Sequence, residues 1–180
     1  KNGKPDEWTL RAAEAKAISV DKNETVSGEA SLKIEHQKGE SYSSVTQLIN
    51  VQPNSTYIMT GYIRTASVLT ESGGYGARYF ISDVKGNGIG SSPSVRGTTP
   101  WREVKIEFST KDQTSIGITF YLHKASGTAW FDDIKLELKS SSVSQQPIAQ
   151  ASLVTNGGFE TVKNGKPDEW TLRAAEAKAI

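Results

Sequence analysis

Apolar and polar residues alternate one by one along most of the chain. Residues 31–36, 56–64 and 115–123 carry apolar side chains at nearly every second position. Because successive side chains of a strand point to opposite faces of a sheet, this period of two predicts half-buried β-strands. Similar segments at residues 45–51, 75–84 and 129–138 predict further strands of the same kind.

Short turn signals separate these segments. Pro53-Asn54 ends one predicted strand, and the turn at residues 85–88 follows another. Only residues 11–16 have a helical composition, and that stretch is short and lacks a capping residue. About nine strands at short spacing predict an all-β fold, an antiparallel β-sandwich of the jelly-roll or Greek-key kind.

Composition limits the function classes. The chain has 180 residues, which suits one domain with some excess. Its formal net charge is +1, and no basic stripe suggests binding to a phosphate backbone, so we expect no nucleic acid partner. The chain has no cysteine, which excludes disulfides and thiolate catalysis. No apolar run approaches the roughly 18 residues of a membrane span, so we expect no membrane partner.

An identical repeat dominates the organisation of the chain. Residues 1–18 recur unchanged as residues 163–180. The sequence therefore comes from a periodic parent, or a segment was duplicated artificially. We interpret residues 1–139 as a module body that lacks its natural first strand. Residues 140–151, rich in Ser and Gln, form a linker, and residues 152–180 supply the first strand together with the second copy.

Two alternatives follow from this rotated frame. Residues 152–180 close onto the body of their own chain, as in a circular permutant, or they insert into a neighbouring chain by strand exchange. In either case the two identical copies compete for one position, and the sequence leaves open which of them is docked.

Catalytic motifs are absent. The sequence contains no nucleotide-binding glycine loop, no HExxH and no GxSxG, and it has only two histidines. Asp132 and Asp133 are adjacent in a predicted strand and should point to opposite faces, so they do not form a glycosidase pair. We expect no enzymatic activity.

Five segments carry a resemblance to a known family. They are Asn156-Gly-Gly-Phe-Glu160 with Trp170, then residues 27–33 (SGEASLK), 51–57 (VQPNSTY), Trp101 with Phe108, and Trp130-Phe-Asp-Asp-Ile134. In natural order they resemble bacterial carbohydrate-binding modules of families 4, 9, 16 and 22, with family 16 nearest.

The resemblance implies a secreted or cell-surface module of a larger bacterial protein. It would hold soluble β-linked polysaccharide, of the glucan, mannan or xylan class, in a cleft on one sheet. It also implies a structural calcium ion near the first and last strands. Glu160 follows the first-strand motif, and Asp132 shares its parity with inward-facing Ile134, so a cation that bridges them would offset a buried charge.

Sugars are bound by aromatic rings and by planar polar groups. Tyr121 and His123 point away from the core in the alternation of residues 115–123, and Tyr121 aligns with an aromatic platform of family 16. An ordinary surface tyrosine is the alternative for Tyr121. Tyr62 and Arg64 are expected to face the same cleft.

Three further candidates come from the resemblance. Arg78 matches a polar position, with a salt bridge on the sheet as the alternative. Gln47 precedes the proline turn and could instead satisfy buried backbone. Trp8, with its copy Trp170, is a weaker stacking candidate, whereas Trp101 and Trp130 are expected in the core. The binding tryptophan of family 16 falls where this chain has Arg11, which predicts weaker binding or another glycan.

Two other functions compete with glycan binding. A structural or adhesive repeat would keep the sandwich and lose the sugar site. An engineered scaffold, permuted or self-assembling, would explain the duplicated residues.

Overall fold

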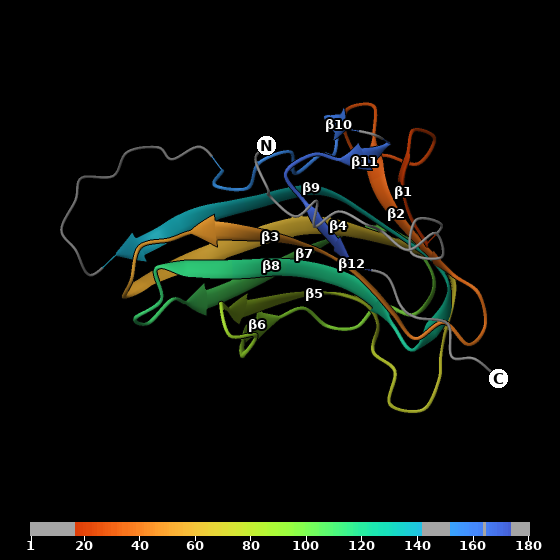
Figure 1. Ribbon diagram of the computed structural model, residues 1–180, viewed down its shortest axis with the longest axis horizontal. Coiled ribbons are helices and arrows are strands. Elements are labelled where there is room, and N and C mark those ends of the chain that lie inside the picture. Colours follow the sequence, from red (N-terminus) through yellow and green to blue (C-terminus); the bar gives the residue numbers. More distant parts are fainter. Residues whose placement is uncertain (1–16, 142–151, 164, 174–180) are drawn as a thin grey trace, which may run out of the picture.

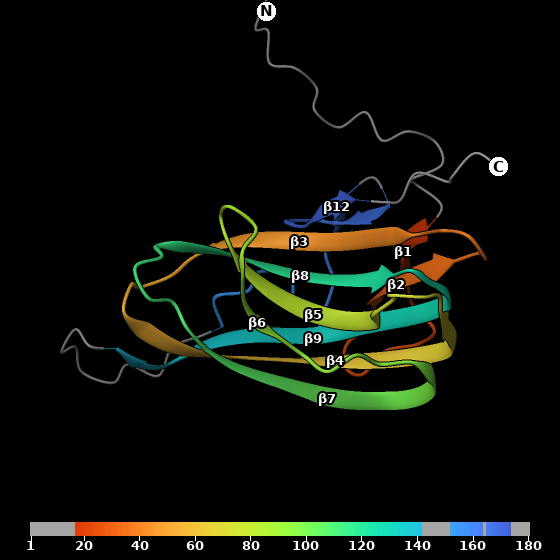
Figure 2. The same ribbon diagram turned by 90° about the horizontal axis from the view of Figure 1, so that it is seen from below.

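The computed structural model describes residues 17–141, 152–163 and 165–173. The larger elements form two five-stranded antiparallel sheets, and their long strands run along the long axis of the molecule (Figure 2). The predicted all-β antiparallel sandwich is therefore confirmed. Sheet A has the order β1 (Ile18–Asp21), β2 (Ser31–His36), β9 (Ala125–Ser141), β4 (Ser55–Thr70) and β7 (Gly97–Ser109).

Sheet B has the order β12 (Thr171–Arg173), β3 (Tyr42–Asn50), β8 (Ser115–His123), β5 (Gly76–Asp83) and β6 (Gly88–Ser91). A small hairpin joins β10 (Val162–Lys163) to β11 (Lys166–Pro167). Among the described residues, no helix is long and apolar enough to cross a membrane.

The alternation read from the sequence places the core between the sheets. The apolar residues of β8 face inward, and those of β4 do the same through Tyr57, Met59 and Ile63, each at most 1% exposed. Phe120 of β8 meets Phe131 of β9 across the layers, with ring centroids 4.7 Å apart. Large inward side chains from both sheets therefore fill the space that a sandwich must close.

Residues 152–173 complete this core from the C-terminal part of the chain. Phe159 is fully buried, and Trp170 is 3% exposed, with its ring centroid 5.5 Å from that of Phe159 and 5.1 Å from that of Phe120. Strand β12 pairs with β3 of the same chain and forms the edge of sheet B. In Figure 1 this segment lies beside β3 and near β1 and β2.

The Asn-Gly-Gly-Phe-Glu motif explains how this segment docks. The side chain of Asn156 accepts from the Thr161 N–H (2.9 Å) and donates to the carbonyls of Thr161 (2.8 Å) and Asp168 (3.0 Å), which shapes the loop. Gly157 lies against β9 so closely that a Cβ would stand 2.1 Å from the Ile134 carbonyl oxygen. A side chain at position 157 is therefore excluded. The motif allows the C-terminal segment to pack directly against β9.

Strand β9 contains an irregularity that changes one prediction. Its pairing with β4 shifts between Thr60 and Tyr62, and Asp133 has a positive φ of 53°. This bulge separates Asp132, paired with outward-facing Tyr62, from inward-facing Ile134. The parity argument for Asp132 is therefore wrong, although Asp132 is fully buried.

Two tryptophans also differ from expectation. Trp101 and Trp130 are only partly buried and stand outside the apolar core. Trp130 lies on the outer face of sheet A, where its indole N–H donates to the Asp21 carboxylate at 2.9 Å. A polar partner on that face fixes this ring there. Among the described tryptophans, Trp170 is the one that enters the core.

Candidate functional site

The register of sheet B aligns the backbones of residues from different strands in transverse rows. One row runs from Arg173 through Ser44 and Tyr121 to Arg78. The adjacent row joins Tyr42 to His123 and Gly76. Both rows lie toward the same end of the sheet, because Tyr42 begins β3 and His123 ends β8.

Five side chains at this end form what we call the tyrosine–arginine cluster. Ring centroids are 5.6 Å apart for Tyr42 and Tyr121, and 5.1 Å apart for Tyr75 and His123, whose planes are nearly parallel. The Arg78 guanidinium carbon lies 4.9 Å from the Tyr75 ring centroid and 5.9 Å from that of Tyr121. Three tyrosines, one histidine and one arginine therefore touch one another on one face.

Exposure within the cluster is graded. Tyr75 is 48% exposed, whereas Tyr121 is 7% exposed. Burial raises the pKa of Tyr121 to about 12, against the opposing positive charge of Arg78. Tyr121 is thus a neutral phenol in the floor of the cluster, and Tyr75 presents the accessible ring.

Two polar atoms of the cluster are shielded from solvent and lack a hydrogen-bond partner. They are Arg78 Nε and His123 Nδ1. Burial lowers the pKa of His123, and the charges of Lys124 and Arg78 lower it further. The cluster thus combines polar side chains with exposed aromatic surface, a combination that is typical of small-molecule sites.

Sequence reasoning found Tyr121, Arg78 and His123 but missed Tyr42 and Tyr75. Tyr42 has the parity of Ser44 and Thr46 on β3, so the same alternation could have placed it on this face. Tyr75 precedes β5 in a loop that follows Gly73 and Gly74. No periodicity applies there, and only the folded loop brings its ring onto His123.

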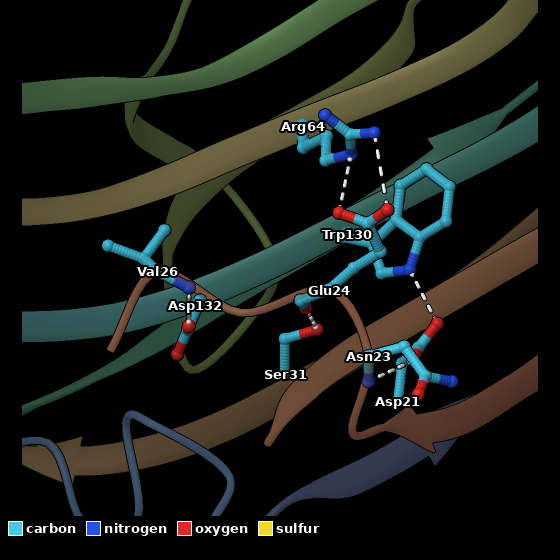
Figure 3. Close-up of polar contacts among 8 residues, drawn as sticks. All are labelled: Asp21, Asn23, Glu24, Val26, Ser31, Arg64, Trp130 and Asp132. Carbon is cyan, nitrogen blue, oxygen red and sulfur yellow. Dashed lines mark hydrogen bonds and ion pairs between the residues drawn. The ribbon is translucent and has the colours of Figure 1, made fainter. Parts of the chain in front are cut away.

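Tyr62 and Arg64 do not join this cluster. Both belong to β4 and stand on the outer face of sheet A, so the expectation that they face the same cleft is wrong. Figure 3 shows the surroundings of Arg64: its Nε lies 3.1 Å from Glu24 Oε2, and its guanidinium covers the Trp130 ring at 5.5 Å. The positive charge of Arg64 is therefore neutralised by Glu24 within the protein. The sequence could not show whether an outward residue belongs to sheet A or to sheet B, because the alternation is the same in the strands of both sheets.

Gln47 has the structural role that was its alternative. Its amide nitrogen donates to the carbonyls of Thr155 and Glu169, each at 3.0 Å, and its oxygen accepts from the Thr155 N–H at 3.0 Å. Gln47 therefore ties β3 to the C-terminal segment. It also lines a groove of about 410 Å³ at this edge, formed by Thr46, Gln47, Leu48, Ile49, Asn50, Leu153, Thr155, Glu169 and Thr171.

Trp8 and Arg11 lie outside the described residues. The identical copy of Trp8, Trp170, is buried in the core with its indole N–H bonded to the Asn156 carbonyl at 3.1 Å. The docked copy is thus a core residue and no stacking platform. The copy of Arg11 is Arg173, whose backbone stands opposite Ser44 in the row of Tyr121 and Arg78.

Glu160 and Asp132 both lie near Gly158. Glu160 Oε1 and Asp132 Oδ1 lie 3.7 and 3.8 Å from the position where a Cβ would stand on Gly158. Glu160 accepts from the N–H groups of Glu29 and Ala30, and Asp132 accepts from those of Val26, Ser27 and Asp133. Burial raises the pKa of Asp132 to about 6, against the effect of these N–H groups. Two carboxylates near one glycine fit part of a calcium shell, while the N–H groups facing them also satisfy both without a cation.

Within the part of the chain that the structure describes, no group of three or more His, Cys, Asp or Glu side chains could hold a metal ion. The groups described above on the outer face of sheet B are aromatic rings, an arginine and hydroxyl groups. That set is suited to recognition by contact and hydrogen bonding.

Comparison with known proteins gives two kinds of similarity. No protein-family model matches the chain. The tRNA nuclease WapA of Bacillus subtilis strain 168 is 26% identical over 199 aligned residues, which cover 96% of this chain and 8% of the nuclease. The tRNA(Glu)-specific nuclease WapA of B. subtilis subsp. natto is 25% identical with the same coverage. The chain thus spans less than a tenth of the length of the curated relatives it matches.

Solved structures show the fold. A carbohydrate-binding module, TmCBM61 in complex with β-1,4-galactotriose, superposes with a TM-score of 0.53 at 22% identity, over 69% of this chain and 83% of the module. A CBM4 structure has a TM-score of 0.51 at 14% identity, over 71% of this chain and 83% of that chain. Arabinose-bound MgGH51 α-L-arabinofuranosidase reaches 0.51 at 19% identity, over 72% of this chain and 24% of the enzyme. The chain has the β-sandwich fold of carbohydrate-binding modules.

Proposed function

We propose that this protein is a non-catalytic carbohydrate-binding module that acts outside the cell as part of a larger bacterial protein. The observation that carries the proposal is the tyrosine–arginine cluster on the outer face of sheet B. The fold shared with carbohydrate-binding modules supports it. The ligand class that we propose is a soluble β-linked polysaccharide of the glucan, mannan or xylan kind.

In this proposal the half-exposed Tyr75 ring stacks on the apolar face of a sugar, and Tyr42 and Tyr121 hold the floor beneath it. The guanidinium of Arg78, which lies over the Tyr75 and Tyr121 rings, donates hydrogen bonds to ligand hydroxyl groups. Thr46 and Thr119, which share a hydrogen bond of 2.9 Å, continue the face along the strands. A chain of several sugars could then run from the cluster over these hydroxyl groups.

Affinity electrophoresis against glucomannan, β-glucan, xylan and galactomannan tests the proposal. We expect retardation by at least one class. Tyr75→Ala should weaken it about tenfold or more, as removal of a central aromatic anchor does. Leu69→Ala, at a 67% exposed position on sheet A, is the matched control and should leave the retardation by each polymer unchanged. If the folded protein is retarded by none of these polymers, glycan binding of this class is wrong.

Calcium belongs to the proposal as a structural ion. We propose that it bridges Glu160 and Asp132 and competes with the N–H groups of the 26–30 loop for their oxygens. Saturating calcium should then raise the melting temperature at pH 7.5, and Glu160→Gln should remove that increase. An equal melting temperature in calcium and in a chelator contradicts the bridge.

A structural repeat is the second candidate, favoured by a separate observation. The similarity to a long nuclease extends over 96% of this chain, including residues 152–173, while it covers only 8% of the relative. Together with the identical 18-residue repeat, this fits one unit of a longer array. A folded chain that binds no polysaccharide would favour this function, or that of an engineered scaffold.

A further inference from the structure

Two arginines of the sandwich lie over aromatic rings, but they differ in whether a carboxylate pairs with them. Arg64 on sheet A covers Trp130 and also pairs with Glu24, at 3.1 Å from its Nε and 3.3 Å from Nη2. Arg78 on sheet B contacts two tyrosine rings but makes no hydrogen bond or ion pair with any residue that the structure describes. The charge of the partly buried Arg78 therefore has no ion-pair partner among the described residues.

More positive charge gathers around Arg78. Lys124 follows His123, and its Nζ lies 3.7 Å from the Cβ position of Gly73. Arg96 runs past Gly76, with its Cγ 3.2 Å from the Cβ position there, and its Nη2 donates to the Gly74 carbonyl at 3.0 Å. These glycines flank Tyr75, so both cations border the cluster.

Within the described part of the chain, no carboxylate forms an ion pair with Arg78, Lys124 or Arg96. Glu71 begins the same loop, where its backbone pairs with Lys124 and Gly74. Both charged groups that shift the pKa of His123 are positive.

We propose that the tyrosine–arginine cluster recognises an acidic glycan, with Arg78 paired to a carboxylate or phosphate group of the sugar chain. This inference rests on the proposed function and names the chemistry of its ligand. The planar guanidinium of Arg78 matches the geometry of either anion, and stacking on tyrosine fixes its orientation. Tyr75 then provides the ring for the sugar that bears the anion.

The test compares polymers that differ only in charge. Affinity electrophoresis is run with glucuronoxylan and its carboxyl-reduced form, and with phosphomannan and its dephosphorylated form. We expect one acidic polymer to bind about tenfold more tightly than its neutral counterpart, as for one charge-assisted hydrogen bond. Which of the two acidic polymers shows the difference distinguishes carboxylate from phosphate.

Three variants assign the effect to Arg78. Arg78→Gln should abolish the preference for the acidic form, and Arg78→Lys should keep part of it, since the charge remains without the planar geometry. Arg64→Gln removes the ring-stacked arginine of the other face and should leave the preference intact. Melting curves show that each variant is folded before binding is compared.

The failures are distinguishable. Equal binding of acidic and neutral forms overturns the acidic ligand and leaves the proposed function standing. No binding of any polymer by the folded protein overturns both. Transfer RNA, added as a further probe, should not compete. Displacement of the acidic glycan by tRNA at equal phosphate concentration would replace our proposal with a general polyanion surface.

Discussion

At the scale of single residues, surroundings decide what each polar side chain does. Arg64 and Arg78 have the same side chain, the same outward parity and a similar aromatic neighbour. Arg64 forms an ion pair with Glu24 of the loop after β1. Its charge stabilises that loop, whereas Arg78 forms no ion pair with any residue that the structure describes.

His36 leads to a prediction about pH. Its Nδ1 lies 3.0 Å from the Ala125 carbonyl and its Nε2 lies 2.8 Å from Ser43 Oγ, so Nδ1 carries the proton of a neutral ring and Nε2 accepts from the hydroxyl. Burial lowers the pKa of His36 below 6.5. The folded state then binds protons less readily than the unfolded state, and the contribution of His36 is complete above pH 6.5 and declines below it.

Urea denaturation between pH 7.5 and 5 measures this decline. His36→Gln should reduce the loss of unfolding free energy that occurs between pH 7.5 and pH 5. His123 also has a lowered pKa, so His123→Gln should remove another part in the same direction. An unchanged slope in both variants would mean that neither histidine is responsible.

At the scale of elements, the C-terminal segment behaves as a missing part of the sandwich. It contributes Val154, Phe159 and Trp170 to the core and adds β12 to the edge of sheet B. Gln47 and Asn156 fix it by hydrogen bonds. Without it, the inner faces of Phe120 and β3 would lose apolar cover.

The two copies of the repeat can be told apart by mutation. Trp170→Ala should lower the free energy of unfolding by about 3–5 kcal/mol, as removal of a buried aromatic ring does. Trp8→Ala should have little effect while the C-terminal copy is docked. Chemical denaturation of both single variants and of the double variant measures this.

Other outcomes are informative. A large effect of Trp8→Ala alone would place the N-terminal copy in the core, contrary to the structure described above. If each single variant is stable and only the double variant is destabilised, either copy can dock.

At the scale of the whole molecule, the two outer faces have different chemistry. That of sheet A carries ion pairs such as Lys33 with Glu35 (2.7 Å) and Arg64 with Glu24, which compensate one another. That of sheet B carries the tyrosine–arginine cluster and a row of hydroxyl groups. A ligand is therefore expected on one side of the sandwich only.

Docking of residues 152–173 on their own body predicts a monomer of 19.5 kDa at equilibrium. The same contacts would form if this segment entered a neighbouring chain, so we propose that refolding at high concentration yields larger species by strand exchange. Light scattering after refolding at several concentrations measures the size. A mass that stays monomeric at every concentration would contradict exchange.

Much of the fold could be predicted because alternation is a local property. The parity of residues 57–63 and 115–123 correctly divided inward from outward side chains, and the turn signals separated the strands. Parity failed at Asp132, where a bulge at Asp133 interrupts it. Parity also failed to assign Tyr62 and Arg64 to a sheet. The two-residue period shows which side chains of a strand point outward, but it does not show which sheet the strand joins.

The sequence by itself determined the fold class, the absence of familiar catalytic motifs and the identity of the two 18-residue copies, since all three are read from residue order alone. Tertiary structure decided which copy fills the core, which sheet carries each outward residue, and that Tyr42 and Tyr75 meet Arg78. Those outcomes depend on contacts between residues distant in the chain. Burial, pairing and unbalanced charge arise only when the strands have assembled.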